Sequence, residues 1–326
     1  MKKLKTYFKY LEPNDYVNQI FIFLITFLVV INHSKIQGWL FILLLNLTLS
    51  FLTAYFTIVY EKSQRDSEKT GNILKIIRFW YPIFTILFFF KEIYIIMIVL
   101  TPVLNDSLLI SIDRMIFGID PTVFLSEYSN PYLTEFLQIV YSLFYLMPVF
   151  YAMELYLWKR YDELKFATFL VLTGFYLSFF GYLILPAIGP RFTLYSFENL
   201  NNEIPGLFLT NTLRDLINIG ESIYPGDIRN PELVAQRDAF PSGHTIVISL
   251  ITYCSFRLKS KSFRFYLPYS LLMIFSTVYL RYHYVIDLIA GIGISVITIL
   301  LGEYFYKDKL KNNGIKFHRK SNNLSR

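Results

Sequence analysis

The chain has 326 residues, of which 54% are hydrophobic and 19% aromatic, and its formal net charge is +7. Together with a mean hydropathy of +0.43, this composition excludes an ordinary water-soluble domain and indicates an integral membrane protein. The positive charge does not indicate a nucleic-acid partner, because most Lys and Arg residues lie in short clusters between long apolar runs. The single cysteine, Cys254, lies inside one of these runs, and a lone cysteine cannot form an intrachain disulfide.

Apolar runs of about 20 residues are long enough to cross a bilayer as helices. The first run follows a basic segment, but no small-residue cleavage site comes after it, so we interpret it as a retained anchor and not as a signal peptide. The chain is therefore predicted to be all-α, a polytopic membrane helical bundle of about eight transmembrane helices. We expect these helices near residues 17–33, 38–60, 74–90, 131–156, 166–186, 241–256, 265–281 and 283–305.

Two segments between these helices have a different character. Lys91 and Glu92 interrupt the apolar run of the third helix, which predicts that Ile93–Leu100 is a re-entrant or interfacial segment. The stretch Ile110–Phe124 is amphipathic and has the same interpretation.

The basic clusters predict how the helices are oriented. Because cytoplasmic loops carry an excess of Lys and Arg, the clusters are expected to face the cytoplasm, together with both termini. The loops 188–240 and 281–283 then lie on the opposite side. The last cluster is interpreted as a contact with the inner leaflet, and the absence of a targeting extension favours the plasma membrane of a bacterium. The clusters are Lys2–Lys9, Lys62–Arg78, Lys159–Lys165, Arg257–Arg264 and Lys307–Arg326.

Two of the four histidines lie in short polar segments on this outer side. The first segment is Phe240-Pro241-Ser242-Gly243-His244, in which the proline is suited to the first turn of a helix because its missing N–H costs nothing there. The backbone N–H groups of Ser242, Gly243 and His244 would then be free at the positive end of the helix dipole, which favours an anion. The glycine would let a phosphate group approach the backbone closely.

The second segment contains His283 and, four residues later, Asp287. This spacing places both side chains on one face of a helix, and ionisable groups in a membrane segment indicate a functional site. Asp287 is expected to accept a hydrogen bond from one ring nitrogen of His283, which leaves the other nitrogen with a free lone pair. This is the orienting part of a nucleophilic triad.

A third polar segment, Pro186–Arg191, ends the fifth helix on the same side. The planar fork of Arg191 is suited to phosphate oxygens, and Arg237 and Arg281 are further candidates. A structural interpretation stands beside each of these functional ones. Interfacial arginines also anchor to lipid headgroups, Ser242 also fits a plain helix cap, and a buried histidine can be a satisfied core residue.

Three ordered segments resemble the motifs of the type 2 phosphatidic acid phosphatase (PAP2) superfamily of membrane phosphatases and phosphotransferases. Within it, the chain is most similar to the branch that includes inositol phosphorylceramide synthases. The resemblance implies a six-helix core, with two accessory helices at 1–72, the catalytic core at 73–306 and a basic cytoplasmic tail at 307–326. The segments are Gly189-Pro190-Arg191, Pro241-Ser242-Gly243-His244 and Tyr279-Leu280-x-x-His283-Tyr284-x-x-Asp287-x-x-Ala290-Gly291.

The chain departs from the family motifs at three positions. The first motif usually has a lysine seven residues before its arginine and a proline after it, where this chain has Ile184 and Phe192. The third motif usually has an arginine six residues before its histidine, where this chain has Thr277. Arg281 is a candidate replacement, although on a continuous helix it would point away from the face of His283. These departures fit the synthase-like branch better than simple phosphatidate hydrolysis.

The resemblance also implies a mechanism that needs neither a metal nor a cofactor. His283 attacks phosphorus and forms a phosphohistidine, Asp287 fixes its tautomer, and His244 acts first as general acid and then as general base. Water as the acceptor makes the protein a phosphatase, and an alcohol makes it a phosphotransferase. The implied phosphate-binding residues are Arg191, Ser242, Gly243 and Arg281.

Two alternatives remain open at this point. Two histidines and an aspartate can bind zinc, although the surroundings of His244 look suited to an anion. A non-catalytic lipid-phosphate-binding protein or a transporter would keep the pocket without turnover; the missing cations favour this alternative, and the retained His244, His283 and Asp287 oppose it. The expected partner is a lipid phosphate in the membrane. The sequence indicates neither the lipid, nor the acceptor, nor the oligomeric state.

Overall fold

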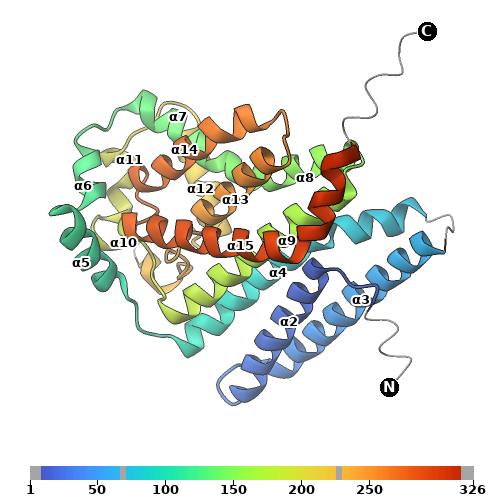
Figure 1. Cartoon of the computed structure of the whole chain (residues 1–326). Coiled ribbons are helices and arrows are strands. Elements are labelled where there is room, and N and C mark those ends of the chain that lie inside the picture. The colour runs from blue at the N-terminus through green and yellow to red at the C-terminus, as the bar shows by residue number, and fades with distance from the viewer. Residues whose placement is uncertain (1–8, 67–70, 225–229, 317–326) are drawn as a thin grey trace, which may run out of the picture.

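The computed structural model describes residues 9–66, 71–224 and 230–316, and its regular structure there is helical (Figure 1). An isolated bridge between Ala187 and Asp238 takes the place of a sheet in this part of the chain. The long helices are α2 (Pro13–Ile31), α3 (Trp39–Arg65), α4 (Asn72–Leu100), α7 (Pro131–Leu143), α8 (Met147–Leu157), α9 (Tyr161–Ile184), α13 (Gly243–Arg257), α14 (Phe263–Tyr279) and α15 (Val285–Lys316). The short ones include α5 (Asp106–Phe117), α6 (Pro121–Ser126), α10 (Pro190–Thr193), α11 (Leu200–Glu203) and α12 (Thr210–Gly220).

The predicted all-α architecture is confirmed for the described residues, and each of the eight predicted segments is helical. Six segments of this described part are long and apolar enough to cross a membrane: α2, α3, α4, the run Pro131–Leu157 that joins α7 to α8, α9, and α15 as far as Leu310. Helices α13 and α14 have 15 and 17 residues, fewer than the roughly 20 that a full crossing needs. The described part of the structure therefore supports six membrane-spanning helices, and the expected count of about eight is not confirmed.

The prediction of a re-entrant or interfacial segment at Ile93–Leu100 is wrong, because α4 continues without a break to its end. Its two charged residues find partners far away in the sequence. The Lys91 ammonium donates to the Gly220 carbonyl at 2.6 Å, and the Asn46 amide on α3 donates to Glu92 at 2.8 Å. A helix can therefore carry these charges through its apolar run.

The amphipathic stretch predicted at Ile110–Phe124 forms two helices, α5 and α6, which are separated at Gly118 (φ +73°). Met115 is 78% exposed on the outward face of α5. Asp106 and Asp113, seven residues apart on the opposite face, are buried. The polar side of α5 thus faces the interior of the protein.

Helix α13 lies at the centre of the bundle and packs against α8, α9, α14 and α15. Its apolar side chains, such as Ile246 and Leu250, are fully buried. A small residue on α9 permits the close contact, since a Cβ atom at Gly174 would lie 2.6 Å from Leu250. Helix α13, which carries His244, also packs directly against α15, which begins two residues after His283.

The accessory helices α2 and α3 form a pair beside α4 and α9 (Figure 1, blue). Phe21 of α2 stacks on Tyr176 of α9 with ring centroids 3.8 Å apart. The Tyr176 hydroxyl donates to Asn18 at 2.7 Å. Both contacts tie the N-terminal helices to the rest of the bundle.

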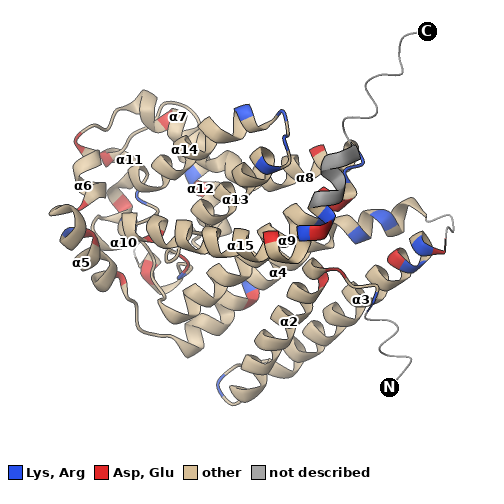
Figure 2. Cartoon of the chain, viewed as in Figure 1, with Lys and Arg blue, Asp and Glu red and all other residues tan. Residues whose placement is uncertain are grey.

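Figure 2 shows that Lys and Arg gather toward the end of the bundle where α3 and α15 end and where α4 and α9 begin. Helices α5, α6, α10 and α11 lie at the opposite end (Figure 1). Most of the predicted cluster Lys2–Lys9 and the end of the predicted tail lie outside the described residues. The tail boundary expected at residue 306 falls inside α15, which continues to Lys316.

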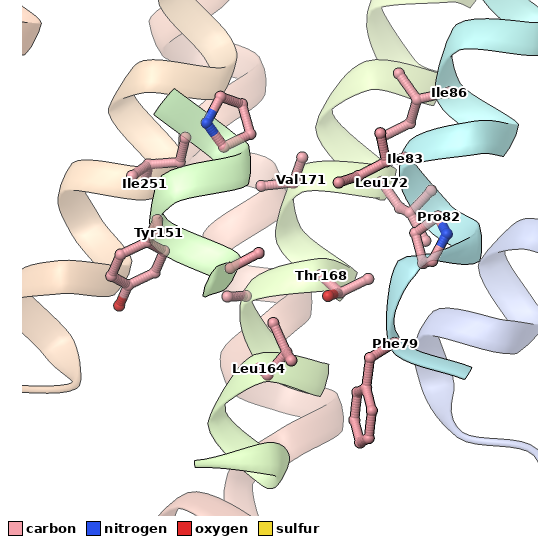
Figure 3. Close-up of a pocket in the computed structure, with 13 residues that line it drawn as sticks. Phe79, Pro82, Ile83, Ile86, Tyr151, Leu164, Thr168, Val171, Leu172 and Ile251 are labelled. Carbon is pink, nitrogen blue, oxygen red and sulfur yellow. The ribbon is translucent and has the colours of Figure 1, made fainter. Parts of the chain in front are cut away.

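An apolar pocket lies between α4 and α8, with α9 as its floor (Figure 3). Its side chains include Pro82, Ile86, Leu164 and Ile251, and the only hydroxyl groups among its lining residues belong to Tyr151 and Thr168. The lining contains no histidine, carboxylate or guanidinium group. This pocket therefore offers apolar contact and no acid–base chemistry.

Candidate active site

The loops that precede α10, α13 and α15 meet at the end of the bundle opposite the basic clusters. Backbone hydrogen bonds join them to one another. The Ala239 N–H donates to the Ala187 carbonyl at 3.0 Å, and the Arg191 N–H donates to the Arg281 carbonyl at 3.0 Å. The three segments singled out in the sequence are thereby brought to one place.

The two histidines are in direct contact at this place. His244 Nδ1 lies 3.2 Å from His283 Nε2, and the ring centroids are 5.4 Å apart. The other nitrogen of His244, Nε2, is buried and has no hydrogen-bond partner among the described residues. One imidazole edge therefore faces its partner, and another polar atom is left for a ligand.

Two acceptors determine the tautomer of His283. Its Nδ1 lies 2.9 Å from the Ala239 carbonyl oxygen and 3.3 Å from a carboxylate oxygen of Asp287. Both are acceptors, so the proton resides on Nδ1 and the lone pair on Nε2. Burial lowers the pKa of His283, in the loop before α15, to about 4, so the ring is neutral at pH 7.

The expectation that His283 and Asp287 share one helix face is wrong in one respect. Helix α15 begins only at Val285, so His283 lies before the helix and Asp287 lies in its first turn. Asp287 takes part in capping this helix by accepting a hydrogen bond from the Tyr284 N–H at 2.9 Å. The same carboxylate oxygen reaches the His283 ring. Asp287 therefore positions both the start of the helix and the imidazole before it.

Ser242 is the N-cap of α13, and its hydroxyl oxygen accepts a hydrogen bond from the Thr245 N–H at 3.2 Å. The expectation that the backbone N–H of Ser242 is free is wrong, because it donates to the Asp287 carbonyl at 3.1 Å. At Gly243, a Cβ atom would lie 2.6 Å from the Tyr182 hydroxyl oxygen. This glycine is thus required by the tyrosine packed against it, in addition to any role toward a phosphate.

Arg191 is fully buried at the start of α10. It donates to Asn218 at 3.1 Å, forms an ion pair with Glu221, and lies 4.6 Å from the ring centroid of Tyr282. The residue before the short helix, Gly189, has φ +94°, and a Cβ there would lie 2.6 Å from the Tyr282 carbonyl oxygen. Only glycine fits this turn, and the turn places the arginine at the site.

Arg281 does not lie on a continuous helix, because α14 ends at Tyr279 and the arginine adopts φ +67°. Its buried guanidinium pairs with Glu203 and lies 3.3 Å from the ring centroid of Tyr195. The geometric objection to Arg281 as a phosphate ligand is thereby removed. Arg237 instead donates to the Thr101 carbonyl at the end of α4.

Sequence analysis missed two carboxylates at the site, Asp238 and Glu221. Burial and the neighbouring Glu221 carboxylate raise the pKa of Asp238 to about 7, whereas His283 and Arg191 oppose this shift. Asp238 forms the bridge with Ala187, which joins the first two loops. A carboxylate three residues before the proline of the first histidine segment carried no signal of this role, since only the fold brings it near His283.

Helix α5 holds two of the loops by their backbone N–H groups. The Asp106 carboxylate accepts from the Gly189 N–H at 2.8 Å and from the Tyr284 hydroxyl at 2.8 Å. The Asp113 carboxylate accepts from the N–H groups of Val285 and Ile286 at 2.8 Å, the first residues of α15. Burial raises the pKa of Asp106 and that of Asp113, and these hydrogen bonds oppose the shift. Their seven-residue spacing on an amphipathic helix was the available sequence signal.

Aromatic rings enclose His244. Its ring centroid lies 4.8 Å from that of Tyr141 and 4.5 Å from that of Phe144. Tyr141 in turn stacks on Tyr282, with centroids 4.1 Å apart. These rings restrict the orientation of the imidazole and limit the access of water.

The three positions at which the chain departs from the family motifs are occupied by uncharged side chains. Ile184 is 74% exposed at the end of α9, and Thr277 is buried with its hydroxyl donating to the Ile274 carbonyl at 2.7 Å. Phe192 lies against Arg191, with the guanidinium carbon 4.5 Å from its ring centroid. None of these three side chains supplies a positive charge.

No group of three or more His, Cys, Asp or Glu side chains arranged to hold a metal ion occurs in the described part of the chain. His33 is exposed in the loop after α2, and His318 lies outside the described residues. The zinc alternative therefore finds no ligand set in the described residues.

Comparison with known proteins adds independent findings. A sequence profile described as the PAP2 superfamily matches residues 107–301, a range that starts within α5 and leaves α2, α3 and α4 outside. A PA-phosphatase related-family protein of Dictyostelium discoideum is 25% identical over 214 residues, which cover 60% of this chain and 36% of that protein. The chain thus spans little more than a third of that relative's length. No solved structure matches.

Proposed function

The chain belongs to the PAP2 superfamily, and from this premise we propose that it is a membrane enzyme that removes or transfers a phosphate group on a lipid. The reaction proceeds through a phosphohistidine at His283. The observation that carries this proposal is the contact of 3.2 Å between His283 Nε2 and His244 Nδ1, with the opposite nitrogen of His283 engaged by Ala239 and Asp287.

In the first step, the Nε2 lone pair of His283 attacks phosphorus and the bond from phosphorus to the lipid oxygen breaks. His244 enters this step as an imidazolium that the negative charge of the bound phosphate stabilises, supplies a proton to the leaving oxygen and becomes neutral. Since His283 Nε2 carries the lone pair, His244 Nδ1 carries the hydrogen of their mutual contact. The proton donor and the nucleophile therefore point at one spot, and the two rings separate when a phosphate enters, because attack requires phosphorus at about 3–3.5 Å from the nitrogen.

In the second step, His244 accepts a proton from the acceptor, whose oxygen then displaces His283 from phosphorus. Arg191, Arg281 and Ser242, together with the backbone N–H groups at Gly243 and His244, stabilise the charge on the other phosphate oxygens. Loss of one such donor in comparable sites costs roughly 3–4 kcal/mol of transition-state stabilisation. Water as acceptor yields free phosphate, and an alcohol yields a new phosphodiester or phosphomonoester.

The site is proposed to face away from the cytoplasm. Support comes from the charge distribution, since Lys and Arg gather toward the end of the bundle opposite the two histidines (Figure 2). The similarity to the inositol phosphorylceramide synthase branch, a plasma membrane location and a bacterial origin stay predictions from the sequence. The branch favours an alcohol acceptor, and the departures at Ile184 and Thr277 are its support.

The test is a turnover assay on the purified full-length protein in detergent. Phosphatidate, undecaprenyl diphosphate and a phosphatidylinositol-type lipid are offered with and without alcohol acceptors. We expect phosphate release or acceptor-dependent product that falls at least about 10³-fold in His283→Ala. His33→Ala is the matched control, because this histidine is exposed in the loop between α2 and α3.

The competing function is a non-catalytic lipid-phosphate-binding protein or transporter. It would give lipid binding that both histidine variants retain and no turnover on any lipid of the panel. The paired imidazoles oppose it, because binding an anion does not require a neutral nitrogen lone pair held against a proton donor. Lipid binding without turnover across the panel would favour this second function.

A further inference from the structure

Arg214, on α12, is a buried arginine that no sequence motif singled out. It is 3% exposed. Its guanidinium donates to the Asn201 side-chain oxygen at 2.8 Å and to the Ile204 carbonyl at 2.8 Å. Both acceptors are neutral, and no carboxylate lies within ion-pair distance of this arginine in the described part of the chain. A buried cation without an anionic partner is costly, so it requires an explanation.

The charges closest to Arg214 make its burial less favourable still. Burial lowers the pKa of Arg214, and the neighbouring guanidinium groups of Arg281 and Arg191 lower it further. The backbones of those two arginines are themselves joined by a hydrogen bond of 3.0 Å. Three segments of the chain thus bring three buried guanidinium groups together, and two of the three have carboxylate partners.

Further polar atoms around these arginines are buried without a partner among the described residues. Arg281 Nε is one of them, and the Tyr282 hydroxyl and the Gln138 side chain on α7, which interact with each other, have no further hydrogen-bond partner in the described part of the chain. Gln138 is completely buried, and Tyr282 and Arg281 immediately precede His283. Unpaired buried donors beside an excess of positive charge are suited to a ligand with several acceptor oxygens.

A hollow on the outer side of this region gives access to Arg214. It lies between α11 and α12 and is lined by Phe197, Arg214 and Asn218, among others, and by two acidic residues, Glu198 and Asp215. Asn218 is the residue that holds Arg191. An anion that reaches Arg214 through this hollow therefore also reaches Asn218, the side chain that contacts the predicted phosphate-binding residue Arg191.

We propose that Arg214 binds the phosphate group of the substrate together with Arg191 and Arg281, and supplies the positive charge that Ile184 and Thr277 do not. That this phosphate belongs to a lipid rests on the proposed function. That an anion binds at Arg214 rests on the geometry of this chain alone. Two bonds to neutral acceptors use two of the five N–H donors of Arg214, so the others remain for phosphate oxygens.

The experiment measures phosphate binding separately from turnover. Inorganic phosphate and orthovanadate are titrated into the purified full-length protein carrying His283→Ala, and affinity is read from the ligand-dependent rise in Tm. In that background, Arg214→Gln is expected to weaken the affinity by about 10- to 100-fold, the range for loss of a charge-assisted hydrogen bond. Arg214→Lys keeps the charge and is expected to restore part of the affinity.

Thr210→Ala is the structural control. Thr210 begins α12, and its hydroxyl donates to Glu135 at 2.6 Å, so its loss destabilises the same helix without touching the arginine. We expect it to lower Tm while leaving the phosphate affinity within about twofold. If Arg214→Gln lowers Tm but leaves phosphate affinity unchanged, or if both variants weaken binding equally, Arg214 is only structural and the inference is wrong.

The same proteins with His283 intact separate this inference from the proposed function. Lipid turnover that depends on His283 but has a KM insensitive to Arg214→Gln would support the function and overturn the role of Arg214. Phosphate affinity that depends on Arg214 in a protein with no lipid turnover would support the role of Arg214 and overturn the proposed function. If both hold, Arg214→Gln raises KM for the lipid by a factor similar to its effect on phosphate affinity.

Discussion

The two ends of the bundle both bury charged groups, but they pair them differently. At the basic end, Arg78 donates to both carboxylate oxygens of Asp15 at 3.0 Å and to Glu61 at 3.0 Å. Lys165 donates to the same Glu61 at 2.6 Å and lies 3.5 Å from Glu12. Each of these buried charges has a partner of opposite sign.

At the site end the pairing is incomplete. His244 Nε2, Arg281 Nε and one carboxylate oxygen of Asp287 are buried without a partner among the described residues, and Arg214 has only neutral partners. The complete network connects α2 and α3 to α4 and α9. The satisfied network joins helices, whereas the unsatisfied groups at the site end lie where we propose that a phosphate binds.

The largest effect on stability is expected from Arg78→Ala. It leaves the Asp15 carboxylate buried without its cation and leaves Glu61 with Lys165 alone, which costs about 3–5 kcal/mol in comparable networks. Tm in detergent measures the loss, and KM of the surviving folded protein should not change. Arg114→Ala, which removes an exposed ion pair with Asp120, should leave Tm nearly unaltered. A normal Tm with altered KM in Arg78→Ala would contradict the structural role of the basic end.

Asp113→Ala should have a smaller effect that reaches the site. The N–H groups of Val285 and Ile286 lose their acceptor at the start of α15, and loss of a helix cap costs about 1–2 kcal/mol. Because His283 lies two residues before this helix, we also expect kcat to fall. Hydrogen exchange at residues 285–288 and steady-state kinetics check both points. Faster exchange with an unchanged kcat would show that α5 only stabilises the helix.

Much of the helical architecture was predictable because each helix is encoded by its own apolar run. The exceptions are those where a distant residue decides. Helix α4 continues through Lys91 and Glu92 because Gly220 and Asn46 satisfy them, and no local pattern contains that information. The predicted number of crossings is also not confirmed, since α14 has only 17 residues although its sequence is apolar.

The candidate site divides in the same way. His283 and Asp287 are four residues apart, so their interaction follows from local geometry even though the helix begins after the histidine. The positions of Arg214 and Asp238 at the site depend on how the long segment between α9 and α13 folds. Periodicity carries no signal for such contacts, because neither residue belongs to a regular pattern that includes the site.

At the site end, Asp238 is expected to make the stability of the protein depend on pH. Its pKa is raised to about 7 by burial and by Glu221, with His283 and Arg191 opposing, while an unfolded aspartate titrates near about 4. The folded chain then holds a proton that the unfolded chain has lost, so stability falls as pH rises from about 4 to 7. Asp238→Asn should exceed the natural chain in Tm at pH 8 and equal it near pH 4. An equal difference at both pH values would contradict this.

The smallest effect is expected from Glu92→Gln. Asn46 donates to one oxygen of Glu92 at 2.8 Å, and the Asn46 oxygen and the second Glu92 oxygen both lack partners among the described residues. A glutamine can pair with the asparagine through both groups, so we expect a change in Tm equivalent to less than about 0.5 kcal/mol. Glu92→Leu leaves the asparagine unpaired and should cost about 1–3 kcal/mol. A larger loss in the glutamine variant would show that a negative charge is needed there.

The proposed phosphohistidine at His283 is tested most directly by trapping the covalent intermediate. A lipid that the protein turns over is prepared with a labelled phosphate group. The purified protein is mixed rapidly with this lipid, quenched in base and analysed by peptide mass spectrometry. We predict an acid-labile, base-stable phosphate on His283, absent in His283→Ala and present at normal level in His33→Ala. Turnover without label on His283, or label on His244 instead, would contradict the assignment of His283 as the nucleophile.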